Sequence, residues 1–121
     1  MRLVQVALKA TELEQSIDFY ADLTGSGPTA VFDPPGLVFF DLDGVRLLLE
    51  REGSAGIVYL RVDDIHATAE RYRHVLAGEP HVIFTHTDDS LGPAGTDEWQ
   101  AFLRDPDGNL VGLVCWLPAR P

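Results

Sequence analysis

One turn signal occurs twice in this chain, and each time it joins two short segments of apolar, β-forming residues. The later copy is Asp-Pro-Asp-Gly-Asn at residues 105–109, between residues 99–103 and 110–116. The earlier copy is Asp43-Gly44, between residues 39–42 and 45–50. Proline fixes φ early in a turn and glycine accepts a positive φ, so both stretches predict a β-hairpin.

The rest of each half repeats as well, which makes the chain a tandem duplication. An apolar segment, residues 3–8 in the first half and 57–62 in the second, precedes an acidic helix start and an aromatic position. The pairs Gln5 and Ile57, Glu12 and Asp64, and Tyr20 and Tyr72 are each 52 residues apart. The two Asp-Gly pairs are 64 residues apart, so the second half carries about twelve more residues. We place them in the loop between Pro80 and Asp97, because long irregular connections collect at loops.

The duplicated order predicts a single α+β domain over residues 1–121, built from two βαβββ modules at about 2–51 and 56–117. A helix on one side of each small sheet leaves the other side uncovered. We therefore expect the two sheets to form one curved, mixed-sheet cup with the helices outside. Alternation along the first strands places Val4, Val6, Val58 and Leu60 toward the helices, and Gln5 and Tyr59 toward the cup.

The helix boundaries are predicted by their end residues. Thr11, followed three residues later by Glu14, predicts a capping box at the start of the first helix. Gly25 predicts the end of that helix. Asp63 and Asp64 suit the positive end of the second helix.

Charge and composition restrict the classes of partner. With 19 acidic and 9 basic residues the formal net charge is −10, so we expect no nucleic-acid partner, because its phosphates would be repelled. The acidity either favours a cationic ligand or only keeps the surface soluble. No apolar run has the length of a membrane span and the N-terminus lacks a signal-peptide pattern, so we expect a cytoplasmic protein with no membrane partner. The single Cys115 agrees with a reducing compartment.

The order of elements, the Phe19-Tyr20 pair in the first helix and the turn at residues 105–109 resemble the vicinal oxygen chelate superfamily. That superfamily includes glyoxalase I, bleomycin-resistance proteins, methylmalonyl-CoA epimerase and extradiol dioxygenases. The resemblance extends over about residues 2–117 and implies paired βαβββ modules that form a cup, often completed by a dimer. Since closed twofold dimers are also the commonest oligomers, we expect a homodimer.

Enzymes of this superfamily hold a divalent metal ion with His and Glu side chains from the first and last strand of each module. When the ligand positions of these enzymes are transferred to this sequence, they fall on Gln5, Leu48, Ile57 and Gly112. Leucine, isoleucine and glycine offer no side-chain ligand, and glutamine alone is a poor one. The resemblance therefore implies a member without a metal or other cofactor, as the bleomycin-resistance proteins are.

The candidate ligand-binding residues follow from the expected cup face and from residue chemistry. Trp99 offers a flat surface for stacking but also suits a core or a dimer interface, and the same two interpretations hold for Trp116. Arg46 either pairs with a carboxylate or phosphate of a ligand or neutralises an acidic neighbour. The full set is Gln5, Arg46, Leu48, Tyr59, Trp99 and Gly112.

The histidines and acidic pairs do not predict a metal site. His81 and His86 are five residues apart beside one strand, which places their side chains on opposite faces and leaves one of them to face the cup as a possible ligand contact. The acidic pairs at residues 88–89 and 97–98 indicate either a cation site or, more commonly, a solvated loop edge. No Ser-His-Asp set, nucleotide-binding glycine loop or Cys-x-x-Cys pair is present, so the catalytic residues are unassigned.

Three functions are open at this point, and whether the chain is an enzyme is one of the differences between them. The first is a protein that binds a small organic molecule, a drug or a metabolite, and sequesters it. The second is a lyase, isomerase or dioxygenase in which His81, His86 or Glu50 supplies the acid–base groups. The third is a protein whose dimer or partner contacts are its function. The missing ligand positions and the aromatic residues favour the first.

Overall fold

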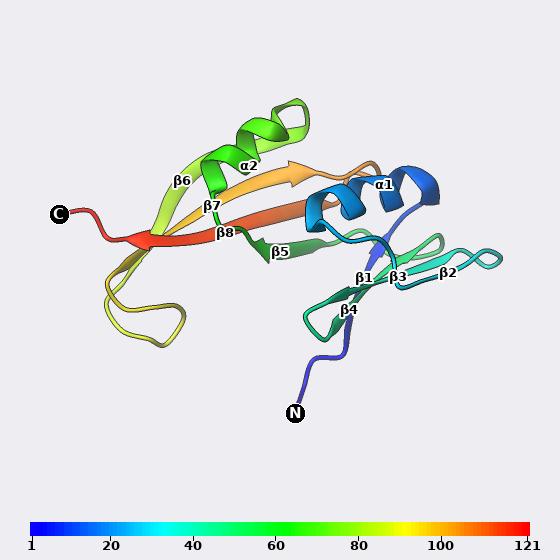
Figure 1. Ribbon diagram of the computed structural model, residues 1–121, viewed down its shortest axis with the longest axis horizontal. Helices are drawn as coiled ribbons and strands as arrows, with labels where there is room; N and C mark the ends of the chain where they lie inside the picture. Colours follow the sequence, from blue (N-terminus) through cyan, green and yellow to red (C-terminus); the bar gives the residue numbers. More distant parts are fainter. The chain divides into compact units, whose positions relative to one another are not determined.

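The computed structural model describes residues 1–121, which form two compact units. Unit 1 comprises residues 1–57 and 105–109, and unit 2 comprises residues 58–104 and 110–121. Each unit has one α-helix and one four-stranded sheet (Figure 1). The α+β class and the two modules predicted from the duplication are confirmed. The closure of both sheets into one cup stays a prediction.

Unit 1 is a four-stranded sheet with helix α1 on one face. Its elements are β1 (Gln5–Lys9), α1 (Leu13–Thr24), β2 (Ala30–Phe32), β3 (Leu37–Leu42) and β4 (Val45–Glu50). The strand order is β1-β4-β3-β2, with β1 parallel to β4 and the other pairs antiparallel. On the helix side the sheet buries Leu8, Val38, Phe40, Leu47 and Leu49. Tyr20 of α1 packs there, with its ring centroid 6.3 Å from that of Phe40.

The alternation predicted for the first strand is confirmed within β1. Leu8 pairs with Leu49 on the helix side, whereas Gln5 pairs with Arg46 on the other face. The placement of Val4 against the helix was wrong. Val4 precedes β1 and is 58% exposed, because the sheet begins only at the next residue.

The turn at residues 105–109 belongs to unit 1, where Asp105 is the centre of a buried polar cluster. Oδ2 of Asp105 accepts hydrogen bonds from the Tyr20 hydroxyl (2.6 Å) and from Nδ2 of Asn109 (2.8 Å). Oδ1 accepts from the backbone N–H groups of Asp107 (2.9 Å) and Asn109 (2.8 Å). Burial, together with the bond to Asp105, raises the pKa of Tyr20 far above its ordinary value. Four donors therefore fix this carboxylate and, with it, the turn.

The same turn also connects distant segments of unit 1. Oδ1 of Asn109 accepts from the N–H of Gly56 (3.0 Å), and Nδ2 donates to the carbonyl of Lys9 (2.8 Å). Oδ1 of Asp107 accepts from both the N–H (3.1 Å) and the hydroxyl (2.5 Å) of Thr11. The turn thus supplies partners to backbone groups of the first 57 residues.

The capping-box prediction for α1 was wrong, because the Thr11 hydroxyl bonds to Asp107 instead. The N-cap residue is Glu12, and no side chain caps the helix start. The end of the helix is as predicted. Gly25 adopts the left-handed conformation with φ of 79° and donates its N–H to the carbonyl of Ala21.

Unit 2 repeats the arrangement with a shorter helix and longer strands. Its elements are β5 (Ile57–Arg61), α2 (Ile65–Arg71), the 3₁₀ turn η1 (Arg73–Val75), β6 (Leu76–His86), β7 (Thr96–Arg104) and β8 (Leu110–Pro118). The strand order is β5-β8-β7-β6, and α2 packs on the face formed by β6, β7 and β8 (Figure 1). Asp64 caps α2 as predicted, since its Oδ1 accepts from the N–H of Ala67 at 3.0 Å. No helix of the chain has the length and apolar character needed to span a membrane.

Strand β6 accounts for much of the extra length of the second half. It has 11 residues, whereas the matching strand β2 has 3. A bulge at residues 82–84 interrupts its alternation, so that His81 pairs with Gln100 and His86 with Thr96, on the same face of β7. The prediction that the two histidines lie on opposite faces was wrong, because it assumed an unbroken strand.

Candidate functional site

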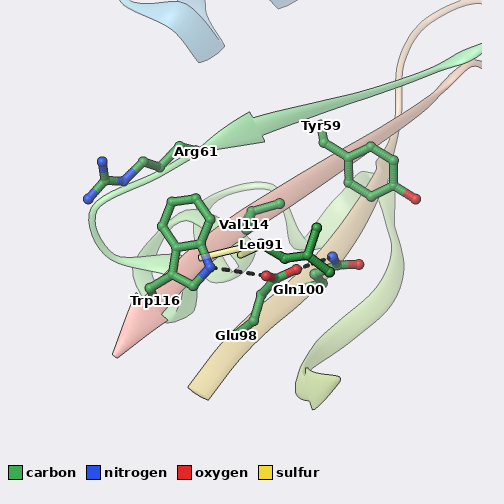
Figure 2. A pocket seen from close by; sticks show the side chains of 7 residues that line it. All are labelled: Tyr59, Arg61, Leu91, Glu98, Gln100, Val114 and Trp116. Carbon is green, nitrogen blue, oxygen red and sulfur yellow. Dashed lines mark hydrogen bonds between the residues drawn. The ribbon is translucent and has the colours of Figure 1, made fainter. Parts of the chain in front are cut away.

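The face of the unit 2 sheet that α2 leaves uncovered, its open face, carries a hollow with a volume of about 390 Å³. Figure 2 shows the side chains around it. They come from β5, the connection at residues 87–95, β7 and β8, and are Tyr59, Arg61, Leu91, Glu98, Gln100, Val114 and Trp116. Small-molecule sites commonly span roughly 300–1,000 Å³, so this hollow has a suitable size.

The register of the β7–β8 hairpin brings polar and apolar side chains together on this face. Glu98 pairs with Trp116, and Gln100 pairs with Val114. Directly opposed residues of an antiparallel pair share one face of the sheet. Strand β7 therefore supplies the polar groups of the hollow, and β8 supplies an indole ring and an apolar side chain.

Glu98 is the centre of a hydrogen-bond network on the floor of the hollow (Figure 2). Its Oε1 accepts from Nε1 of Trp116 (3.0 Å) and lies 2.8 Å from Nε2 of His86. Its Oε2 accepts from Nε2 of Gln100 (2.8 Å). The His86 side chain is 3% exposed and that of Glu98 is 14% exposed. The network is therefore largely removed from solvent but still borders the hollow.

The hydrogen bonds decide the charge of Glu98. Burial raises the pKa of this carboxyl, but bonds from His86, Gln100 and Trp116 together outweigh burial and bring the pKa below its ordinary value. Glu98 is therefore ionised at neutral pH. A carboxylate of lowered pKa accepts hydrogen bonds and attracts a positive charge, but it is a weak base for proton abstraction.

The connection at residues 87–95 packs closely over this network. A Cβ atom at Gly92 would lie 2.7 Å from Nε1 of Trp116 and 2.9 Å from Nε2 of His86. Glycine at this position allows the close approach. The neighbouring Leu91 is 78% exposed and lines the hollow. Leu91 and Glu98 also line a second hollow of about 400 Å³, together with Ile83, Phe84 and His86.

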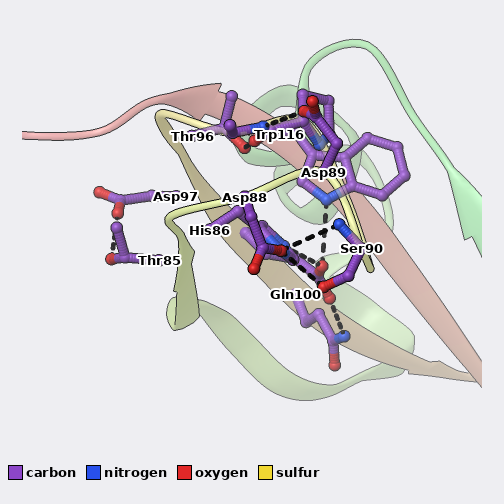
Figure 3. Close-up of polar contacts among 12 residues, drawn as sticks. Thr85, His86, Asp88, Asp89, Ser90, Thr96, Asp97, Gln100 and Trp116 are labelled. Carbon is purple, nitrogen blue, oxygen red and sulfur yellow. Dashed lines mark hydrogen bonds and ion pairs between the residues drawn. The ribbon is translucent and has the colours of Figure 1, made fainter.

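The acidic residues of the connection hold its backbone. Oδ1 of Asp88 accepts from the N–H (3.0 Å) and hydroxyl (2.6 Å) of Ser90, and Oδ1 of Asp89 accepts from the N–H of Ala94 (2.8 Å) (Figure 3). No group of three His, Cys, Asp or Glu side chains in the chain is arranged to hold a metal ion. Asp88 and Asp89 thus serve the loop itself.

Tyr59 covers Gly112 at another side of the hollow. A Cβ atom on Gly112 would lie 2.8 Å from Cε2 of Tyr59 and would overlap its Cδ2 atom. The Tyr59 ring also makes an edge contact with Phe102, with centroids 5.9 Å apart. Both predicted residues therefore lie on the open face of unit 2. The missing side chain at residue 112 does not widen the site, because the Tyr59 ring takes that space.

The predicted residues of the first half lie together on the open face of unit 1. Nε of Arg46 donates to Oε1 of Gln5 at 3.0 Å, and its guanidinium lies 5.7 Å from the centroid of Phe39. Leu48 pairs with Phe39 and is nearly buried. Arg46 therefore binds an amide and an aromatic ring rather than an acidic neighbour.

Trp99, predicted to stack on a ligand, lies on the other face of unit 2. It pairs with Cys115, and its ring centroid is 4.9 Å from that of His66 on α2. The guanidinium of Arg120 lies 5.6 Å from the Trp99 ring. The placement of Trp99 on the cup face was wrong, because the hairpin register sets it opposite a residue of the helix side. Trp116 is the tryptophan of the open face.

The four positions implied as metal ligands do not fit a divalent ion. Oε1 of Gln5 already accepts from Arg46, and Leu48 and Ile57 have no donor atom. The Tyr59 ring covers the place that a side chain at Gly112 would take. These residues support no metal-dependent step.

The predicted ligand-binding set lacked several residues of the hollow: Gln100 was not named, and Glu98 was considered only as part of an acidic pair. A signal for them was present. The turn at residues 105–109 sets Arg104 opposite Leu110, and counting outward from that pair sets Glu98 opposite Trp116. The contribution of Leu91 had no such signal, because no strand register extends into the connection.

Comparison with known proteins gives matches only among solved structures, since no protein-family model and no curated protein matches the sequence. An antibiotic binding protein from Streptomyces sp. CB03234 aligns with a TM-score of 0.70 and 21% identity, over 98% of this chain and 97% of that one. A lactoylglutathione lyase from Agrobacterium tumefaciens aligns with a TM-score of 0.66 and 22% identity, over 94% and 92% of the two chains. A glyoxalase/bleomycin resistance protein/dioxygenase from Alicyclobacillus acidocaldarius aligns with a TM-score of 0.66 and 18% identity, over 96% and 92%.

The chain has the glyoxalase/bleomycin-resistance fold. The resemblance based on the turn at residues 105–109 and the Phe19-Tyr20 pair is thereby confirmed at the level of the fold. This fold serves both an antibiotic binding protein and an enzyme among the matches. Function must therefore be argued from the site.

Proposed function

We propose that the chain binds a small organic molecule, a drug or a metabolite, in the hollow of unit 2, and that it does so without a metal ion. The observation that carries the proposal is the make-up of the hollow. Trp116 and Tyr59 offer aromatic surface, Leu91 and Val114 are apolar, and Glu98 and Gln100 add polar atoms. Sites for small molecules commonly combine apolar walls with a few fixed polar groups.

The fixed geometry of the floor supports the same proposal. Trp116 is held by its bond to Glu98, and the backbone at Gly92 packs against the indole nitrogen. A side chain that is already ordered loses little conformational entropy when a ligand binds. The antibiotic binding protein of the same fold adds support by analogy.

A lyase, isomerase or dioxygenase is the alternative that the His86–Glu98 pair favours. A buried histidine next to a carboxylate is a common acid–base arrangement. The lowered pKa of Glu98 counts against this alternative, because it weakens the carboxylate as a base near neutral pH. The enzyme alternative would be favoured if the His86→Gln variant lost a catalytic activity of the wild type while its ligand affinity stayed unchanged.

The two tryptophans provide the test of the binding site. The indole N–H of Trp116 borders the hollow, whereas Trp99 lies on the opposite face of the same sheet. In an NMR screen of planar drugs and metabolites against ¹⁵N-labelled protein, we expect binders to shift the Trp116 indole signal and not that of Trp99. Compounds that shift only Trp99 would contradict the proposal.

Paired variants extend the test. We expect Trp116→Ala to weaken binding about five- to a hundredfold, equivalent to about 1–3 kcal/mol. The matched variant Trp99→Ala removes packing against His66 and is expected to lower thermal stability with the affinity nearly unchanged. An affinity that depends on Trp99 and not on Trp116 would place the ligand elsewhere.

The metal-free part of the proposal has its own measurement. Elemental analysis of protein purified without chelator is expected to give no stoichiometric metal. Thermal-shift assays with zinc, nickel and manganese are expected to give no large stabilisation, because Gln5, Leu48, Ile57 and Gly112 offer no set of donors. Stoichiometric metal would reopen the enzyme alternative.

We further propose that the protein is a homodimer. Both units expose large apolar side chains. They are Val31 and Phe32 in unit 1, and Ile83 and Phe84 in unit 2. Apolar surface of this kind is commonly buried by a twofold partner. Light scattering at tens of micromolar protein should give the dimer mass, and a monomer mass would contradict the proposal.

We also propose a cytoplasmic location for the protein. Its single cysteine, Cys115, is buried and free, and free cysteines are typical of a reducing compartment. Fractionation of the native cells, followed by immunodetection, tests this location. Recovery from the extracellular or membrane fraction would refute it.

A further inference from the structure

We propose that the hollow of unit 2 selects organic cations, with Glu98 as the counter-ion. The ligand is a planar or apolar molecule that carries a protonated amine or amidine. The inference rests on the proposed binding function and names its ligand class. It is argued from the hydrogen-bond geometry of Glu98, from the charges around it and from the aromatic walls.

The two carboxylate oxygens of Glu98 differ in the number of hydrogen bonds that they accept. Oε1 has two partners, His86 and Trp116, whereas Oε2 has one, the amide of Gln100. A carboxylate oxygen accepts two hydrogen bonds, so Oε2 has capacity for one more. Since Glu98 lines the hollow, a donor on a bound ligand can use this capacity in place of water.

The direct partners of Glu98 bring at most one positive charge. Trp116 and Gln100 are neutral donors, and His86 is charged only when it is protonated. Strand β5 contributes Arg61, which makes no ion pair and lies over the Trp116 ring at 5.1 Å from its centroid. In Figure 2 the Arg61 guanidinium extends away from Glu98. The connection at residues 87–95 adds two further carboxylates, Asp88 and Asp89.

The walls of the hollow suit a cation as well. Arg61 shows that the Trp116 ring already attracts a positive group, as aromatic faces do. Tyr59 offers a second ring, 55% exposed and without a cation over it. The net charge of −10 draws cations toward the whole protein and repels anions. Charge, aromatic surface and the free capacity of Oε2 therefore point to the same class of ligand.

Three probes with one ring system and different charge test the inference: 2-(aminomethyl)naphthalene, 2-naphthalenemethanol and 2-naphthoic acid. They are a cation, a neutral molecule and an anion near neutral pH. We expect the amine to bind about tenfold tighter than the alcohol, because a hydrogen bond between charged groups is roughly twice as strong as a neutral one. Binding is read from the indole N–H of Trp116, with that of Trp99 as the internal reference.

Two variants separate local from general electrostatics. Glu98→Gln removes the counter-ion and is expected to reduce the affinity for the amine about tenfold, to that of the alcohol. Glu14→Gln removes the same charge from an exposed position on α1 and is expected to leave the affinity unchanged. An equal loss in both variants would show a general attraction of cations and would overturn the role of Glu98.

The outcomes of the probe experiment distinguish the two proposals. If the alcohol or the acid shifts Trp116 with the higher affinity, the cation class is overturned and the hollow remains the binding site. If none of the probes shifts Trp116 up to millimolar concentration, both the cation class and the binding site are overturned. The wild-type comparison does not depend on the folding of any variant.

Discussion

The buried cluster around Asp105 allows a sharp test through removal of one oxygen atom. In the Tyr20→Phe variant the ring and its contacts with Phe40 stay, and the hydroxyl that donates to Oδ2 at 2.6 Å is lost. Asp105 is 5% exposed and makes no ion pair, so water does not replace the missing donor easily. Three of its four donors would remain.

The expected cost follows from the charge of the acceptor. A hydrogen bond to a buried charged group contributes about 1.5–3 kcal/mol to the free energy of unfolding. For a chain of 121 residues this corresponds to a fall in melting temperature of roughly 5–15 °C. Urea unfolding followed by circular dichroism gives the free energy, and calorimetry gives the melting temperature.

Tyr59→Phe is the matched control, because it removes the same atom from an exposed side chain that makes no hydrogen bond. We expect this variant to unfold within about 0.5 kcal/mol of the wild type. The role of the Tyr20–Asp105 hydrogen bond would be refuted if Tyr20→Phe were as stable as the wild type. The same would follow if the Tyr59→Phe control lowered the free energy of unfolding by as much as Tyr20→Phe.

Three further predictions concern Gly112, the cap of α2 and the ionisation of Tyr20. Gly112→Ala is expected to displace the Tyr59 ring at a cost of about 1–3 kcal/mol, and this cost should vanish in a Tyr59→Ala background; equal costs in both backgrounds would contradict the overlap. Asp64→Ala is expected to destabilise the protein by about 0.5–2 kcal/mol in urea unfolding through loss of the α2 cap, and an unchanged midpoint would contradict that role. Because folding raises the pKa of Tyr20, the neutral hydroxyl contributes stability that is fully present below the unfolded pKa of about 10 and is lost at higher pH. Alkaline titration should therefore destabilise the wild type more steeply than Tyr20→Phe, and equal slopes would contradict this contribution.

The repeat in the sequence was sufficient to predict the two modules, because strand and helix periodicity are local properties of the chain. Gln5 and Leu8 fell on opposite faces of β1 as the alternation required. The error for Trp99 arose from judging a side chain by its chemistry alone. Its partner Cys115 is buried on the helix side, and the hairpin register connects the two residues.

Other features depend on geometry that no periodic pattern encodes. The bulge at residues 82–84 turns His86 to the face of Glu98, where it joins the network of the hollow. The partner of Thr11 lies 96 residues away, so a local capping motif had no means of indicating it. The pKa of Glu98 likewise depends on three donors from separate strands.

The membership of the turn at residues 105–109 in unit 1 has a consequence for how the protein is made. Residues 1–57 leave the ribosome well before Asn109 is synthesised, and until then Gly56 and Lys9 lack the side chain that binds them. Contacts between residues so distant in sequence also form slowly, because a long loop must close first. The half of the protein that is translated first is therefore among the last parts to be completed, and a nascent chain that stops before residue 109 leaves that half open to proteases and chaperones.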